Sequence, residues 1–143
     1  TLRDVIKRYD LLCEKADIKI VCDATAGLMV RADEARIQQV LFNLINNAFN
    51  YSEPGGVIAV NARPEGRVVR VEVSDTGKGI PPEDLENIWD RYYKGDKSEG
   101  RKTIGTGLGL AIVKNILEAH KAGFGVDSTV GKGTIFWFRL ERA

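Results

Sequence analysis

The sequence predicts an α+β fold in a single domain that spans 1–143. Two observations carry this prediction. Three longer segments place apolar residues at the i, i+3, i+4 spacing of amphipathic helices, and five short segments alternate apolar and polar residues or are rich in β-branched residues, as strands are. A chain of 143 residues buries about two-thirds of its unfolded surface when it folds.

The expected elements follow one another in a simple order. Helices are expected at 2–16, 33–51, 82–89 and 108–120, and strands at 18–22, 57–63, 67–74, 124–129 and 133–140. The second and third strands should form an antiparallel hairpin that turns at Pro64-Glu65-Gly66. Pro82 at a helix start, with the acidic Glu83 and Asp84 after it, favours the short helix at 82–89.

Composition argues against several classes of protein. The formal net charge of +1 gives no indication of a nucleic-acid partner or an anionic membrane surface. Cys13 and Cys22 lack the spacing of a metal site and are too few for a disulfide scaffold, so a reducing, cytoplasmic setting is expected. The apolar runs are much shorter than a membrane span, and no direct membrane contact is expected from this chain.

The expected helix at 33–51 carries the first candidate site. Its apolar stripe consists of Ile37, Val40, Leu41, Leu44, Ile45 and Ala48. Asn43, Asn47 and Asn50 fall together on the flank of this stripe, while Asn46 should point away from it. Because asparagine is a weak helix former, three in register indicate either a solvated polar flank or a polar site at the edge of the core. Amide oxygens suit a hard cation such as Mg²⁺, and amide nitrogens suit phosphate oxygens.

Asp75 is the second candidate. Val69, Val71 and Val73 face one side of their strand, and Asp75 continues their parity, so its carboxylate should be buried. A buried carboxylate without partners is costly; either a backbone cap satisfies it, or a ligand donor such as the exocyclic amine of adenine does. The glycines of the following Thr76-Gly77-Lys78-Gly79-Ile80 belong either to an ordinary loop or to a place where a ligand approaches the backbone closely.

Two later segments fit an anionic ligand. Residues 90–103 have no clear period and hold five Lys or Arg against three acids, which fits a mobile lid or merely a solvated surface. Gly105-Thr106-Gly107-Leu108-Gly109-Leu110 opens the helix at 108–120 and either offers free N–H groups to a phosphate or serves as a glycine-rich cap. His120, the only histidine, is expected to act in packing or at the helix C-terminus and not as a nucleophile.

Taken together, these segments resemble the ATP-binding catalytic domain of sensor histidine kinases, part of the superfamily shared with gyrase, Hsp90 and MutL-type ATPases. The family's five motifs occur in order as Asn43-Leu44-Ile45-Asn46-Asn47-Ala48, Asp75-Thr76-Gly77-Lys78-Gly79, Arg91-Tyr92-Tyr93-Lys94, Gly105-Thr106-Gly107-Leu108-Gly109-Leu110 and Gly131-Lys132-Gly133-Thr134. The resemblance covers nearly the whole chain. It implies a Bergerat-type two-layer α/β sandwich, in which a mixed, mostly antiparallel sheet of about five strands is covered on one face by about three helices, with a mobile ATP lid.

The resemblance also implies Mg²⁺ and ATP as ligands and gives individual residues roles. Asn47 would coordinate Mg²⁺, Asn43 would help order that site, and Lys94 would be aimed at the terminal phosphate. At the base, Tyr51 would lie over the adenine and Asp75 would accept a hydrogen bond from its amine. The other expected nucleotide contacts are Asn50, Gly77, Gly79, Ile80, Tyr93, Gly105, Thr106, Gly107, Leu108, Gly109, Leu110 and Thr134.

The chain departs from the family pattern at one position and lacks one component. Asn50 stands where the family often has lysine, which removes one positive charge near the phosphates. The family phosphorylates a histidine on a separate dimerisation hairpin, and neither that histidine nor the carboxylate that acts as base beside it is found here. Residues 1–16 are expected to be the tail of the connection from such a hairpin. A response regulator would act downstream, and the parent protein is expected to be cytoplasmic or the cytoplasmic part of a membrane-bound sensor.

The function implied is transfer of the γ-phosphate of Mg-ATP to a histidine on the partner hairpin, within a two-component system. An anti-sigma-type kinase that acts on a protein serine shares the fold and motifs and stays open, as does a nucleotide-binding module without catalysis. A gyrase-like ATPase is disfavoured, because those enzymes place a water-activating glutamate where this chain has Asn43.

Overall fold

The computed structural model describes residues 2–90 and 109–143. Its elements are α1 (Leu2–Lys7), α2 (Asp10–Ala16), β1 (Lys19–Ala24), α3 (Glu34–Tyr51), β2 (Val57–Glu65), β3 (Val68–Asp75), α4 (Gly109–Ala119), β4 (Phe124–Thr129) and β5 (Gly133–Glu141). Every strand expected from the alternation of the sequence is present, each with its bounds shifted by two residues or fewer.

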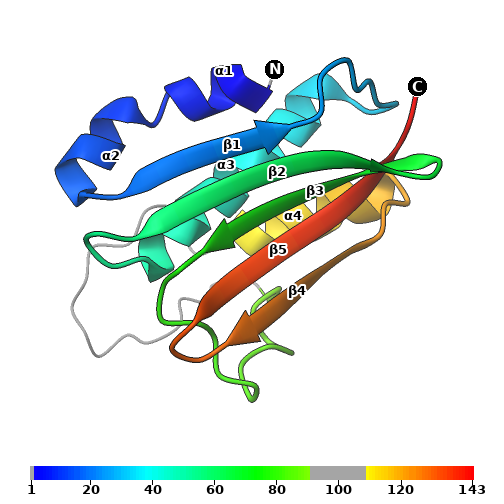
Figure 1. Ribbon diagram of the computed structural model, residues 1–143. Coiled ribbons are helices and arrows are strands. Elements are labelled where there is room, and N and C mark those ends of the chain that lie inside the picture. Colours follow the sequence, from blue (N-terminus) through cyan, green and yellow to red (C-terminus); the bar gives the residue numbers. More distant parts are fainter. Residues whose placement is uncertain (1, 91–108) are drawn as a thin grey trace.

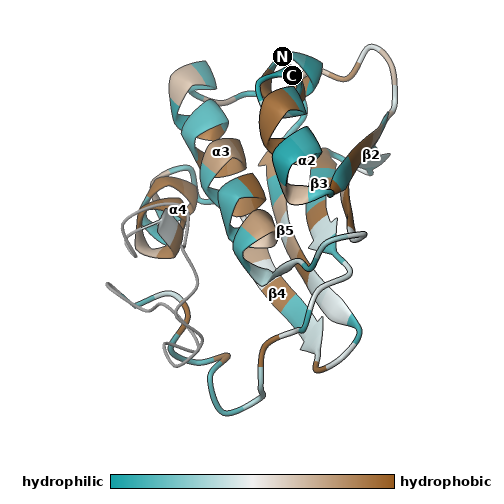
Figure 2. Ribbon diagram, turned by 90° about the vertical axis from the view of Figure 1, so that its left-hand side faces the viewer, coloured by the Kyte–Doolittle hydropathy of each residue, from teal (hydrophilic) through white to brown (hydrophobic). Residues whose placement is uncertain are grey.

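The strands form one five-stranded sheet in the order β1-β2-β3-β5-β4. The pairing of β1 with β2 is parallel, and the other three pairings are antiparallel. Parallel neighbours need a crossover connection, and α3 provides it between β1 and β2. Figures 1 and 2 show α3 and α4 packed on one face of the sheet, so the fold is the mixed, open, two-layer sandwich that the resemblance implied.

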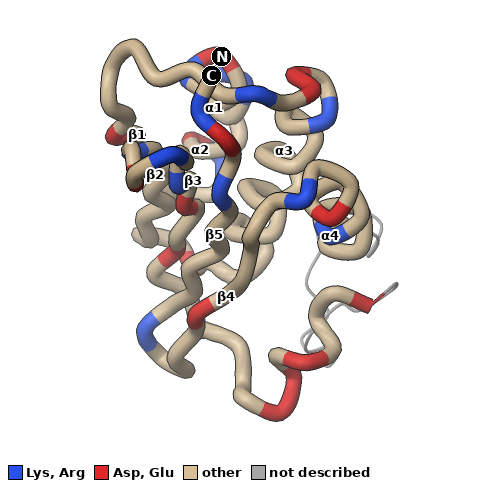
Figure 3. The backbone as a smooth tube through the Cα atoms, turned by 90° about the vertical axis from the view of Figure 1, so that its right-hand side faces the viewer, with Lys and Arg blue, Asp and Glu red and all other residues tan. Residues whose placement is uncertain are grey.

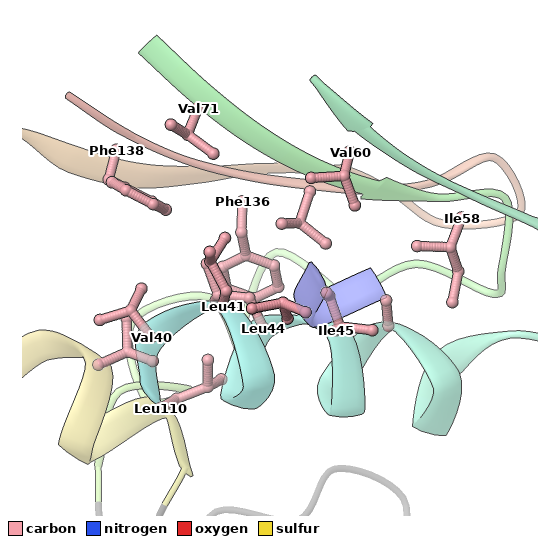
Figure 4. Close-up of a cluster of buried hydrophobic side chains, with 14 of the residues drawn as sticks. Val40, Leu41, Leu44, Ile45, Ile58, Val60, Val71, Leu110, Phe136 and Phe138 are labelled. Atoms are coloured by element: carbon pink, nitrogen blue, oxygen red, sulfur yellow. The ribbon is translucent and has the colours of Figure 1, made fainter. Parts of the chain in front are cut away.

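The core lies between this face of the sheet and α3. The apolar stripe belongs to the core as expected: five of its six residues are buried, and Ile37 packs against them. Figure 4 shows Leu41, Leu44 and Ile45 of α3 facing side chains from β2 and β5. Burial of each such aliphatic side chain stabilises the fold by about 1.5–3 kcal/mol. The stripe therefore fixes the rotation of α3, and with it the direction of every polar residue on that helix.

The amino-terminal helix expected at 2–16 is divided into α1 and α2, so the described residues form four helices instead of about three. The break lies at Arg8 and Tyr9, where the backbone N–H of Tyr9 bonds to the carbonyl of Ile6 at 3.0 Å, in a turn tighter than α-helical. The ring of Tyr9 is buried and stacks on Phe49 of α3 with 5.6 Å between ring centroids. The break lets this ring reach α3, a tertiary contact that the periodicity of a single segment does not reveal.

The short helix expected at 82–89 is absent; that prediction was wrong. Successive turns replace it, such as those closed by Asp84 N to Pro81 O and Asn87 N to Asp84 O, each at 2.9 Å. Ile88 is buried, and the ring of Trp89 makes T-shaped contacts with Phe124 and Phe136, with ring centroids 5.2 and 5.7 Å apart. These apolar contacts fix the position of the segment. Its acidic residues lie along the loop, where Figure 3 shows them in red.

The β2–β3 hairpin also turns later than expected. Pro64 belongs to β2 and lies opposite Val69, while Glu65 lies opposite Val68. The turn is made by Gly66, with φ of +64°, and Arg67. Glycine adopts such a positive φ without strain, and this freedom decides where the hairpin reverses.

Within the described residues, no helix combines the length and the apolar character that a membrane span requires.

Candidate nucleotide-binding site

The asparagine row lies on the side of α3 that neighbours α4. The helix begins at Asp33, whose side chain accepts a hydrogen bond from the N–H of Arg36 at 3.2 Å and so caps the first turn. Asn43 lies against the first residue of α4, since a Cβ at Gly109 would be 3.2 Å from Asn43 Oδ1. A larger residue at the start of α4 would therefore have to displace this amide slightly.

Asn47 lies one turn further along α3. Its Nδ2 atom is buried and has no hydrogen-bond partner among the described residues. Buried polar groups almost always have partners, so this amide is a candidate for contact with a ligand. Asn50 follows on the next turn and is half-buried. Asn46 does not join this row; its Oδ1 accepts a hydrogen bond from the hydroxyl of Tyr9 at 2.8 Å.

The end of α3 is joined to the glycine loop that follows β3. Tyr51 is buried, and its carbonyl oxygen accepts a hydrogen bond from the N–H of Lys78 at 3.2 Å. A Cβ at Gly77 would overlap that carbonyl oxygen, so the close approach requires glycine. The Nζ of Lys78 lies 5.9 Å from the centre of the Tyr51 ring.

Asp75 ends β3 and faces the core side of the sheet with an exposed fraction of only 7%. Its Oδ1 accepts a hydrogen bond from the N–H of Gly77 at 2.9 Å. Burial raises the pKa of this carboxyl to about 6, and the backbone N–H groups of Gly77 and Thr134 oppose the rise. A backbone cap therefore satisfies part of the carboxylate, while a carboxylate has about four acceptor positions in all. The remaining positions can accept from a ligand.

The β4–β5 hairpin supports the same loop from the other side. Gly79, with φ of +75°, packs so closely on the backbone of Thr129 that a Cβ there would overlap its carbonyl oxygen. The N–H of Gly131 bonds to the carbonyl of Lys78 at 2.9 Å. Thr134 is buried and lies opposite Asp75 in the β3–β5 register. The hairpin thus holds the loop beside the buried acid.

The structure brings the expected residues together along the second half of α3, which runs to Tyr51. Asn43 lies against the start of α4, and Tyr51, Asp75, Gly77, Gly79 and Thr134 meet at the carboxyl end of α3. The eight residues from Asn43 to Tyr51 correspond to about 12 Å along a helix axis, so Asn43 marks an amide end of the candidate site and Asp75 an acid end, with Asn47 between them. Ile80 and Leu110 are buried in the core, so their side chains pack there. The expected contacts Tyr93, Lys94, Gly105, Thr106, Gly107 and Leu108, and the lid itself, lie outside the described residues.

One residue of this region was missed at the sequence level. Ser128 of β4 accepts a hydrogen bond from the N–H of Ile80 at 2.7 Å and lies 2.8 Å from the Thr134 hydroxyl. A signal existed, because Ser128 shares the parity of Phe124 and Val126 on β4, and both of these pack against the core.

The donor set fits a magnesium ion that arrives with phosphates. Among the described residues, no group of three or more His, Cys, Asp or Glu could hold a metal by itself. Mg²⁺ is usually held by few protein oxygens, several waters and the substrate's phosphates. The unpartnered Nδ2 of Asn47 can donate to a phosphate oxygen, and the oxygen of the same amide is the atom that would hold Mg²⁺.

The chain matches, over residues 32–143, the family described as histidine kinase-, DNA gyrase B-, and HSP90-like ATPase. It belongs to this family. Among curated relatives, it is 44% identical over 138 residues to the sensor histidine kinase WalK of Bacillus subtilis, with 95% of this chain and 23% of WalK aligned. It is 37% identical over 137 residues to the sensor-like histidine kinase SenX3 of Mycobacterium bovis, with 96% of this chain and 33% of SenX3 aligned. The chain therefore spans a third or less of these relatives' length.

Solved structures agree with this placement. The catalytic domain of histidine kinase ThkA superposes with a TM-score of 0.85 and 29% identity, covering 99% of this chain and 90% of that one. Full-length ShkA in complex with AMPPNP gives a TM-score of 0.85 and 30% identity, covering 99% and 29%. ThkA in complex with its response regulator TrrA gives 0.77 and 28%, covering 99% and 39%. These relatives are sensor histidine kinases, and the structural neighbours are histidine kinases or their catalytic domains.

Proposed function

We propose that this domain binds Mg-ATP along α3 and donates the γ-phosphate to a histidine on a separate helical hairpin, as the catalytic part of a two-component sensor kinase. The observation that carries the proposal is a buried, incompletely satisfied acid, Asp75 of β3, beside the carboxyl end of the helix that bears the asparagine row. The kinship with sensor histidine kinases favours histidine over serine as the phosphate acceptor.

The acid end of the site would bind the base. Asp75 would accept a hydrogen bond from the exocyclic amine of adenine, Tyr51 would lie over the ring, and the backbone at Gly77 and Gly79 would pack beside it. Support comes from the burial of the carboxylate and from the close packing of both glycines on the carbonyls of Tyr51 and Thr129, which holds the loop beside that acid. Such a site rejects a base that presents a carbonyl in place of the amine, because two acceptors would then face each other.

The asparagine end would bind the phosphates. Asn47 would hold Mg²⁺ through its amide oxygen, and Asn43 would order that amide from the neighbouring turn of α3. When bound, Mg²⁺ supplies charge neutralisation between the phosphates, which phosphoryl transfer generally requires. Lys94, together with the second glycine segment at 105–110, is assigned to the terminal phosphate by sequence resemblance alone.

The same residues argue against efficient hydrolysis of ATP by water. A neutral amide at Asn43 cannot accept a proton from water, so this position lacks a general base. The chain would need the partner hairpin, with its histidine and carboxylate, for fast turnover. The proposed further partner is a response regulator, by analogy with ThkA, which was solved in complex with one. The proposed location is the cytoplasm or the cytoplasmic part of a membrane-bound sensor.

The experiment that tests this proposal mixes the domain with γ-labelled ATP, Mg²⁺ and a hairpin domain from its own parent protein or a close relative. The expected product is acid-labile, base-stable phosphate on the hairpin, as a phosphohistidine gives. A matched control is Asn61→Ala, which removes an amide from the sheet face opposite α3 and should not change the rate. Acid-stable phosphate on a serine would support the anti-sigma-type alternative instead, and bound ATP without any transfer would support a module without catalysis.

A further inference from the structure

The hydroxyl of Ser128 touches three polar groups around the acid end of the site. Its Oγ lies 2.7 Å from the backbone nitrogen of Ile80, 3.1 Å from the carbonyl oxygen of Gly133 and 2.8 Å from Oγ1 of Thr134. These three groups come from the glycine loop and from the start of β5. Ser128 therefore connects the two backbone segments that border Asp75.

The directions of these three hydrogen bonds follow from the number of hydrogens available. A serine hydroxyl has one hydrogen to donate and can accept two. The N–H of Ile80 can only donate, and the carbonyl of Gly133 can only accept. If all three contacts are hydrogen bonds, the Ser128 hydrogen is committed to Gly133, and the Thr134 hydroxyl must donate its own hydrogen to Ser128. Thr134 then has only lone pairs left for any other partner.

We propose that Ser128 is a positioning residue that makes the Thr134 hydroxyl an obligatory hydrogen-bond acceptor at the base end of the site. Thr134 and Asp75 are cross-strand neighbours on the helix-covered face of the sheet, and both are buried. With Ser128 in place, the two side chains present acceptors only. The inference rests on the proposed binding of ATP and adds a residue that sets selectivity for a purine with an amine at position 6 over one with a carbonyl there.

The test compares ATP with inosine triphosphate, which carries a carbonyl at that position. In calorimetric titrations with Mg²⁺, the wild-type domain should bind ATP much more tightly than inosine triphosphate. In Ser128→Ala the Thr134 hydroxyl is free to donate to a carbonyl, so the ratio of the two affinities should narrow by about tenfold, the worth of one hydrogen bond. The matched control is Ser74→Ala, which removes a hydroxyl from the adjacent position to Asp75 with only a 3.5 Å contact to Ala59, and which should leave the ratio unchanged.

A second pair of variants separates selectivity from stability. Ser128→Ala also removes the acceptor of the Ile80 N–H, so the fold itself is weakened. Ser128→Cys keeps the shape with a weaker acceptor and should give an intermediate ratio if the alanine variant does not fold. In a Thr134→Val background the change at Ser128 should no longer alter the ratio, because no hydroxyl remains to be oriented.

The outcomes distinguish this inference from the proposed function. If the wild-type domain binds neither nucleotide, the proposed function fails. If it prefers ATP but the ratio is the same in the Ser128 variants, or if the ratio still shifts in the Thr134→Val background, ATP binding stands and the orienting role of Ser128 is overturned.

Discussion

The hydroxyl of Tyr9 donates a hydrogen bond to Oδ1 of Asn46 across 2.8 Å, and so joins the amino-terminal helices to α3. Its ring lies between Phe42 and Phe49, with centroids 6.0 and 5.6 Å away. Helix α3 therefore makes different contacts on three sides: one side packs on the sheet, one contacts Tyr9, and one bears Asn43 and Asn47. A displacement of the amino-terminal helices acts directly on the helix that carries the candidate phosphate site.

Tyr9→Phe should lower the free energy of unfolding by about 1–2 kcal/mol, because Asn46 Oδ1 loses its donor while the ring packing is kept. Chemical denaturation measures this loss. Burial raises the pKa of Tyr9, so the phenol stays protonated and the effect should be equal at pH 6 and pH 8. In an Asn46→Ala background, Tyr9→Phe should lower the free energy of unfolding by a distinctly smaller amount. If the two losses of free energy simply add in this double-mutant cycle, the two side chains do not interact.

Asp75→Asn should stabilise the nucleotide-free domain at neutral pH. The folded-state pKa of Asp75 is raised from 3.8 to about 6, so the unfolded chain releases this proton first and the carboxyl lowers stability as pH rises from about 4 to about 6. The full effect above pH 6 is about 3 kcal/mol. Asparagine has no such titration, so the variant should melt higher than wild type at pH 7.5 and at nearly the same temperature below pH 4. An equal shift at both pH values would refute the ionisation argument.

The same substitution should weaken binding of ATP and ADP alike, because both carry the same base. Titration of each nucleotide at pH 7.5 provides the measurement. If only ATP binding fell, Asp75 would belong with the phosphates and the orientation proposed for the nucleotide would be reversed.

Asn47→Ala should remove the magnesium-dependent part of ATP binding while the fold remains intact. The side chain has a buried amide end without a partner among the described residues, so its loss leaves no donor or acceptor stranded. Calorimetry in Mg²⁺ and in EDTA, for wild type and variant, isolates the metal-dependent part. Unchanged Mg-ATP affinity would contradict the role proposed for Asn47.

His120 should accept a hydrogen bond at Nε2 and donate one from Nδ1. The backbone N–H of Asp33 donates to Nε2 at 3.1 Å, and Nδ1 lies 2.8 Å from the carbonyl of Ile116, which can only accept. Because His120 is the only histidine in the sequence, its nitrogen chemical shifts can be assigned without ambiguity. A dominant Nε2–H tautomer would mean that the contact between α4 and the cap of α3 is absent in solution. The sequence-based expectation of a helix-end role, and not a nucleophilic one, agrees with these contacts.

Periodicity was sufficient to locate the individual strands and α3, since each of these segments repeats a pattern along its length. The parity argument for Asp75 also held, because alternation in β3 continues unbroken to its last residue. The parallel pairing of β1 with β2 could not be predicted in this way, because alternation shows that a strand exists but not with which strand it pairs. The partner of Asn46 could not be predicted, because Tyr9 is 37 residues away and no helical pattern reaches that far.

The wrong prediction at 82–89 and the missed residue Ser128 have similar causes. The segment at 82–89 has a good helix start, but its shape is set by the packing of Trp89 on Phe124 and Phe136, a contact between distant segments. Ser128 drew no attention because a single serine in a strand is usually unremarkable, and its three partners become neighbours only when the hairpin folds over the glycine loop.

The contact of His120 with Asp33 ties one end of α4 to α3, so that α4 can be treated as a rod held at that end. Its carboxyl end is fastened to the beginning of α3, and its amino end, Gly109, sits beside Asn43. Over the roughly 16 Å of an eleven-residue helix, a rotation of about 5° around that fulcrum moves Gly109 by about 1.4 Å. A displacement of that size would change the separation of Gly109 and Asn43, so the packing of α4 on α3 sets the room beside this asparagine.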